Sequence, residues 1–142
     1  MSTLSTSASR FSTPSIVLHW LMAVMLVGLV VAIELHEAFP KGSDMRTLLV
    51  RGHFMMGITV FGLVWVRLLM RLLGPTPAIV PAPPVWQDRA GRLMHLALYA
   101  LMLALPLVGW LLVNAKGRPV PYFFGLQLPT LIEASRPLAE TL

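Results

Sequence analysis

The chain alternates long apolar stretches with short polar segments, and three of the stretches are long enough to cross a membrane as helices. Residues 15–33 contain no charged side chain, and they supply the roughly 20 residues that a hydrocarbon core about 30 Å thick requires of a helix. Residues 48–73 and 93–113 form two further stretches of similar character, and the arginines of the first of these lie toward its ends. The pattern predicts an all-α transmembrane helical bundle with three spanning helices.

Composition supports a membrane protein and narrows its chemistry. Hydrophobic residues make up 56% of the 142 residues and charged residues 12%, and without an internal repeat this length predicts one membrane-embedded domain over residues 1–142. The absence of cysteine excludes disulfides, iron–sulfur clusters and covalently attached haem. The net charge is +5, but the basic residues form no stripe with interleaved aromatics, so we expect the lipid bilayer and not nucleic acid as a partner.

Two histidines, His19 and His53, lie inside the first two spanning segments. Consecutive spans run antiparallel, so the two side chains are expected near opposite faces of the bilayer. At 1.5 Å per residue, about 15–20 Å should separate their levels. An imidazole in hydrocarbon is costly and by default marks a functional site. We interpret both as axial ligands of haem iron, and an interhelical hydrogen bond is the alternative for each.

The neighbours of these histidines suit a flat cofactor. Gly57 follows His53 by one helical turn and therefore shares its face, and Gly52 and Gly62 are close by. Ala23 has the same relation to His19. Small residues allow a porphyrin to approach the helix backbone. The sequence therefore predicts two haem b groups, held without covalent attachment.

Two arginines and a third histidine complete the predicted cofactor-binding set. Arg71 lies five turns after His53, so it shares that face at the opposite end of the segment, near the level of His19. A guanidinium there can pair with a haem propionate, and Arg67 is predicted for the same role. Snorkelling to lipid headgroups is the alternative for both arginines. His95 begins the third segment on the side of His19, where we expect a role beside the ligands or at the interface; direct ligation is its alternative.

Five motifs in order give the chain a family resemblance. From about Phe11 onward it resembles the bacterial cytochrome b-561 family, in particular its superoxide:ubiquinone oxidoreductase (superoxide oxidase) members. The motifs are residues 16–20, residues 51–53 with Gly57, residues 66–77, His95 with Tyr99, and residues 105–110. The resemblance implies a four-helix inner-membrane protein with two b haems that exchanges electrons with the quinone pool. It also implies that His19 ligates the cytoplasmic-side haem and His53 the periplasmic-side haem.

The sequence departs from that family at its C-terminal end. The family's fourth helix, which carries the opposing axial histidines, should begin just after residues 138–142, where the chain stops. We therefore expect a C-terminally incomplete domain with three of four helices. The missing helix or a second protein chain would complete the ligation, with His95 as a partial substitute near His19. In this form the chain is expected to be poor in haem, unstable in detergent and inactive.

Orientation and location follow from charge and from the resemblance. Lysines and arginines divide almost evenly between the two sides, so the positive-inside rule does not decide the topology. The arginines beside the short connector after residue 73 favour a cytoplasmic N-terminus. We therefore expect a multi-pass protein of the bacterial cytoplasmic membrane.

The predicted function is electron transfer by an oxidoreductase of the superoxide:quinone type. Electrons would pass through haem b from a periplasmic one-electron donor, superoxide, to ubiquinone. Arg51, Lys116 and Arg118 should lie near the periplasmic-side haem and steer anionic superoxide, or else simply face headgroups. Two other functions stay open: a cytochrome b subunit that anchors a dehydrogenase or hydrogenase, and a transporter or proton relay without haem.

Overall fold

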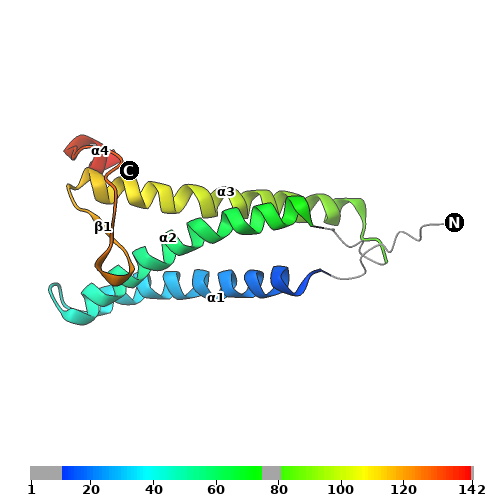
Figure 1. The fold of residues 1–142 in the computed structure, drawn as a ribbon, viewed down its shortest axis with the longest axis horizontal. Coiled ribbons are helices and arrows are strands. Elements are labelled where there is room, and N and C mark those ends of the chain that lie inside the picture. Colours follow the sequence, from blue (N-terminus) through cyan, green and yellow to red (C-terminus); the bar gives the residue numbers. More distant parts are fainter. Residues whose placement is uncertain (1–10, 75–80, 142) are drawn as a thin grey trace.

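The structure, a computed structural model, describes residues 11–74 and 81–141. In chain order these residues form α1 (Thr13–Leu35), the 3-10 turn η1 (His36–Ala38), α2 (Asp44–Leu73), α3 (Val85–Ala115), β1 (Val120–Pro121), the 3-10 turn η2 (Phe123–Gly125), β2 (Gln127–Leu128) and α4 (Arg136–Thr141) (Figure 1). Helices α1, α2 and α3 are long and apolar enough to cross a membrane. The predicted all-α transmembrane bundle with three spanning helices is confirmed.

Each spanning helix is longer than the apolar stretch that predicted it. Helix α2 begins at Asp44 instead of residue 48 because Ser43 caps it: the Ser43 hydroxyl accepts a hydrogen bond from the Arg46 backbone nitrogen at 3.3 Å. Helix α3 begins directly after Pro84 instead of at residue 93. Hydrophobicity marks only the part of a helix that lies in hydrocarbon, whereas capping residues mark where the helix itself starts.

Helices α1 and α2 form an antiparallel pair joined by a short turn. The Arg46 guanidinium fixes this turn, because its Nη1 donates to the backbone oxygens of His36 at 3.1 Å and Phe39 at 3.0 Å. Figure 1 shows that α1 ends, α2 begins and α3 ends on the same side of the bundle. We call this side the His53 end and the opposite side the His19 end.

The interface between α1 and α2 follows a repeat of four and three residues along α2. His53, Gly57, Val60, Val64 and Arg67 share this face. The middle three are buried. Val60 and Val64 form the central core with Met22 of α1, and the partly buried side chains around them are Leu18, Met25, Leu26, Leu63, Tyr99, Met102 and Leu103.

Helix α2 lies between α1 and α3 (Figure 1). Much of α3 has exposed apolar side chains, among them Leu93, Leu96, Leu101 and Leu105. Such a surface is expected of a bundle whose outer solvent is lipid, because lipid chains are as apolar as leucine.

Helix α3 ends in a hydrogen-bonded cap of the Schellman type. Gly117 has φ +70°, a conformation that glycine adopts without steric cost. Its N–H donates to the Asn114 carbonyl at 2.8 Å, and the N–H of Arg118 donates to the Val113 carbonyl at 3.1 Å. The chain can therefore reverse sharply at the end of the span.

A small β-hairpin follows, which the hydrophobic pattern did not predict. Strands β1 and β2 pair antiparallel, with Val120 opposite Leu128. The segment runs across the His53 end of the bundle from α3 toward α2 (Figure 1). Helix α4 then returns to α3, where the N–H of Ser135 donates to the Ala115 carbonyl at 2.9 Å.

Candidate functional site

The imidazole of His53 bridges the two best-packed helices. It is half-buried on α2, and its Nδ1 lies 2.8 Å from the backbone oxygen of Leu29 on α1. A carbonyl oxygen can only accept, so we assign the hydrogen to Nδ1, which leaves the lone pair of Nε2 free. Histidine ligands of metals are commonly oriented by such a bond to a backbone carbonyl. The interhelical hydrogen bond, which was the alternative to haem ligation, is thus present. It uses Nδ1, so Nε2 could still bind a metal.

Open space lies one helical turn from His53. Gly57 is buried, yet a Cβ added there would meet no atom within 4 Å outside its own helix backbone. The other side of the interface is tight, because a Cβ at Gly28 would lie 3.3 Å from the Met56 sulfur. Helices α1 and α2 therefore approach closely beside Leu29, whereas there is room beside Gly57. This combination suits a flat group next to His53.

His19 lies on an exposed part of α1. Its ring centroid is 5.8 Å from that of Trp20. One turn earlier, the Ser15 backbone oxygen accepts a hydrogen bond from Nη1 of Arg67 at 3.5 Å, so the half-buried Arg67 is level with the start of α1. Arg71, one turn further along α2, is exposed. Of the two arginines assigned to propionates, Arg67 is the one that reaches α1.

His95 occupies an exposed position on α3. Its Nδ1 lies 2.8 Å from the Gly91 backbone oxygen of the same helix, so Nε2 is again the nitrogen left free. Tyr99, one turn further, is half-buried against the central core. His95 therefore stands at the His19 end of α3, turned away from the well-packed interface.

The two candidate ligands lie at different depths. His53 is level with Leu29, which follows His19 by ten residues on α1, so their levels differ by about 15 Å at the helical rise of 1.5 Å per residue. Within residues 11–74 and 81–141, no cluster of three or more His, Cys, Asp or Glu side chains is placed to hold a bare metal ion. A haem needs only axial ligands from the protein, because the porphyrin itself holds the iron.

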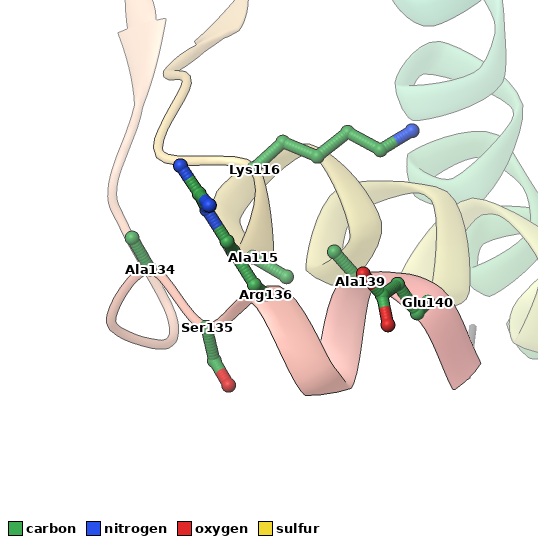
Figure 2. Close-up of a pocket in the computed structure, with 7 residues that line it drawn as sticks. All are labelled: Ala115, Lys116, Ala134, Ser135, Arg136, Ala139 and Glu140. Carbon is green, nitrogen blue, oxygen red and sulfur yellow. The ribbon is translucent and has the colours of Figure 1, made fainter.

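Basic side chains gather at the His53 end. Arg51, Lys116 and Arg118 are all exposed. An open hollow of about 560 Å³ lies between the end of α3 and α4. Figure 2 shows the residues that line it: Ala115, Lys116, Ala134, Ser135, Arg136, Ala139 and Glu140. Its lining includes no histidine, so the hollow is separate from both candidate ligands.

Sequence reasoning missed two polar side chains that organise the His53 end. Asn114 is 1% exposed; its Nδ2 donates to the Arg118 carbonyl at 3.3 Å, and its Oδ1 accepts from the Leu131 N–H at 2.9 Å. The Tyr122 hydroxyl lies 3.3 Å from the Thr59 hydroxyl on α2. For Asn114 the sequence did offer a signal, because a side-chain amide near the end of an apolar span is unusual.

Comparisons with known proteins give a consistent relationship. A family model described as prokaryotic cytochrome b561 matches residues 10–141. The chain is 41% identical over 110 residues to cytochrome b561 homolog 1 of Escherichia coli (strain K12), a match covering 78% of this chain and 62% of that protein. It is 31% identical over 133 residues to the probable superoxide oxidase CybB of Yersinia pestis, covering 94% of this chain and 74% of that protein. It is 28% identical over 133 residues to cytochrome b561 homolog 2 of Escherichia coli (strain K12), covering 88% of this chain and 67% of that protein. The match spans less than two thirds of the length of the first of these relatives.

Proposed function

The chain belongs to the prokaryotic cytochrome b561 family, and from this premise we propose that it is one membrane-embedded domain that carries electrons through two non-covalent haem b groups. The donor we propose is superoxide on the periplasmic side, and the acceptor is ubiquinone. The membrane is the bacterial cytoplasmic membrane, with the N-terminus in the cytoplasm. Family membership supports haem b and membrane electron transfer; donor, acceptor, haem number and orientation are the parts proposed here.

One observation supports the proposal most: the bond between His53 and Leu29. At 2.8 Å it holds the ring by Nδ1 and leaves Nε2 available, and Nε2 is the atom that would ligate the haem at the His53 end. Open space beside the buried Gly57 supports the placement of a macrocycle there. His19 is the proposed ligand about 15 Å away along the membrane normal, so the two haems would lie near opposite membrane faces.

The other proposed site residues act by charge and position. Arg67, held near Ser15, and Arg71 would pair with propionates of the haem at the His19 end, where a planar guanidinium matches a carboxylate. His95 would stand beside that haem without ligating it. The haems supply one-electron redox chemistry, while these side chains fix their position and local potential.

The overall reaction balances with one-electron and two-electron partners. Two superoxide anions each lose one electron and become O2. Ubiquinone takes up the two electrons with two protons and becomes ubiquinol. The relative named as a probable superoxide oxidase, 31% identical to this chain, supports superoxide as the donor. The exposed Arg51, Lys116 and Arg118 at the His53 end would attract an anion to that face.

The test is an absorption spectrum, before and after reduction, of the protein in its own membranes together with any helix or partner chain that completes the haem ligation. We expect b-type haem bands on reduction with dithionite, the same bands on exposure to superoxide, and their loss when oxidised ubiquinone is added. A colourless protein would contradict the proposal and support a transporter or proton relay. Haem bands that respond only when a soluble dehydrogenase or hydrogenase is bound would support an anchor subunit instead.

A further inference from the structure

The segment from Pro119 to Ile132 is unusual for a connection outside the spanning helices. It contains no charged residue along fourteen positions, and its sequence is PVPYFFGLQLPTLI. Connections that face water are normally rich in polar residues, because their backbone and side chains remain solvated. The composition of this segment instead resembles that of a surface in contact with lipid.

The segment is held in a defined shape. Val120 is fully buried, and β1 contacts both α2 and α3. The Asn114 side chain bonds to Arg118 just before the segment and to Leu131 near its end. The Tyr122 N–H donates to the Leu126 carbonyl at 2.8 Å and closes the tip. The exposed side chains at the tip are therefore presented by a fixed scaffold.

Phe124 stands at that tip in a rare conformation. Its φ of +57° lies in the left-handed region, which a bulky residue other than glycine seldom adopts, and such outliers are often tied to function. Its side chain is 100% exposed. The ring centroid of Phe123 is 6.5 Å away, and Phe123 and Leu126 are also exposed. The backbone thus directs an aromatic pair outward instead of into the core.

A residue beside the hairpin tip contacts the apolar part of α2. The Tyr122 hydroxyl contacts Thr59 at 3.3 Å, and Thr59 itself donates to the Met55 carbonyl at 2.7 Å. Thr59 lies near the midpoint of α2. Polar groups within a bilayer require partners inside the protein, and both hydroxyls have them. This contact excludes a hairpin that stands free in water.

We propose that residues 119–132 form an interfacial anchor, in which Phe124 enters the boundary between headgroups and acyl chains of the leaflet at the His53 end. The partner is the lipid itself. Lys116 and Arg118 precede the segment and are exposed, so the aromatic pair that meets the acyl chains stands beside positive charge, as is common for elements that lie in a membrane interface. A docking surface for a soluble protein normally has a polar rim, whereas Gln127 and Thr130 are the exposed polar side chains of this segment.

The experiment uses a fluorescent label whose emission depends on lipid contact. The chain has no cysteine, so Phe124→Cys gives one labelling site for NBD. Lys41→Cys, exposed in the turn between α1 and α2 at the same end, gives the matched control. Each labelled protein is reconstituted in bilayers with and without lipids brominated near the headgroup, and emission and quenching by aqueous iodide are compared. Comparison of the same variant in the two bilayers cancels any quenching by haem.

We expect the label at position 124 to lose emission in brominated lipid and to resist iodide, with the reverse at position 41. Shallow bromines should quench more than deep ones, because interfacial side chains enter only about 5–10 Å. Strong iodide quenching at position 124 would overturn the proposal, since the tip would then face water. Protection from both quenchers would also overturn it and would indicate a covering protein; a second copy would be recognised if protection disappeared on dilution in the bilayer.

Discussion

The Nδ1 atom of His53 lies 2.8 Å from the backbone oxygen of Leu29, and this contact fixes the depth of the α2 histidine against α1. His19 precedes Leu29 by ten residues on the same helix. Helix α1 therefore carries the His19 imidazole and also fixes the level of the His53 imidazole. The spacing of about 15 Å depends on the register of a single helix pair, so it should persist whatever else packs around the bundle.

The first prediction concerns the two proposed ligands. In the protein with its haems bound, His53→Ala should remove one of two spectroscopically distinct b haems and His19→Ala should remove the other, because the histidines lie at separate depths. The measurement is a redox titration of reduced-minus-oxidised spectra for each variant. His36→Ala, in the turn η1, is the control and should leave both haems in place. Two haems with unchanged potentials in either of the first two variants would show that the ligand assignment is wrong.

A second prediction uses the open space beside His53. Gly57→Ala should fold normally, with the free energy of unfolding changed by no more than about 1 kcal/mol, since its Cβ meets no neighbour. Gly57→Phe should fill that space and lower haem occupancy at the His53 level only. Haem content per protein and the redox titration measure the effect.

Gly62 provides the matched control for that substitution. A Cβ there also meets no atom within 4 Å, but the residue is exposed instead of buried. Gly62→Phe should therefore keep full haem content. Equal losses in the two phenylalanine variants would mean that Gly57 has no special relation to the cofactor.

The three spans were predictable because each apolar stretch has the length and the low charge that a membrane-spanning helix requires. Their ends were not, since helix starts depend on local caps such as Ser43 and Pro84 and not on hydrophobicity. The hairpin at 120–128 was missed for a related reason. Its strands have only two residues each, which is too short for an alternating pattern to be seen.

The candidate site was only partly accessible from sequence. Four residues stand out because polar side chains are rare in membrane spans: His19, His53, Arg67 and Arg71. The Leu29 acceptor could not be predicted, because any backbone carbonyl of α1 offers the same chemistry and only the helix register selects one. The contact between Arg67 and the Ser15 backbone oxygen could not be predicted either. Arg67 and Arg71 share one face of α2, so the sequence offered Arg71 equally well for the level of His19.

A third prediction concerns the two hydrogen bonds of the Asn114 side chain at the end of α3, which we call the Asn114 clasp. Asn114→Ala would leave the Leu131 N–H without its acceptor and the Arg118 carbonyl without its donor. A typical hydrogen bond within a protein contributes about 0.5–1.5 kcal/mol to stability, so we expect a lower unfolding temperature in detergent and faster proteolysis within residues 118–131. Identical stability in wild type and Asn114→Ala would show that the clasp does not hold the segment.

The last prediction concerns electrostatic attraction of superoxide to the His53 end. Arg51, Lys116 and Arg118 are exposed there, and a converging positive potential can raise the rate of encounter with an anion by 10-fold or more. Lys116→Glu combined with Arg118→Glu should therefore lower the second-order rate of haem reduction by superoxide. The rate of the unmodified protein should fall as salt is added, because the Debye length shrinks to about 3 Å at 1 M.

Arg89→Glu, at the opposite end of α3, separates this effect from a general change in charge. It alters net charge in the same direction but lies at the His19 end, so the rate and its salt dependence should stay close to those of the unmodified protein. Stopped-flow measurements at several ionic strengths distinguish the variants. If the rate is insensitive both to salt and to the reversals at positions 116 and 118, these residues only face headgroups, and superoxide loses its electrostatic support as the donor.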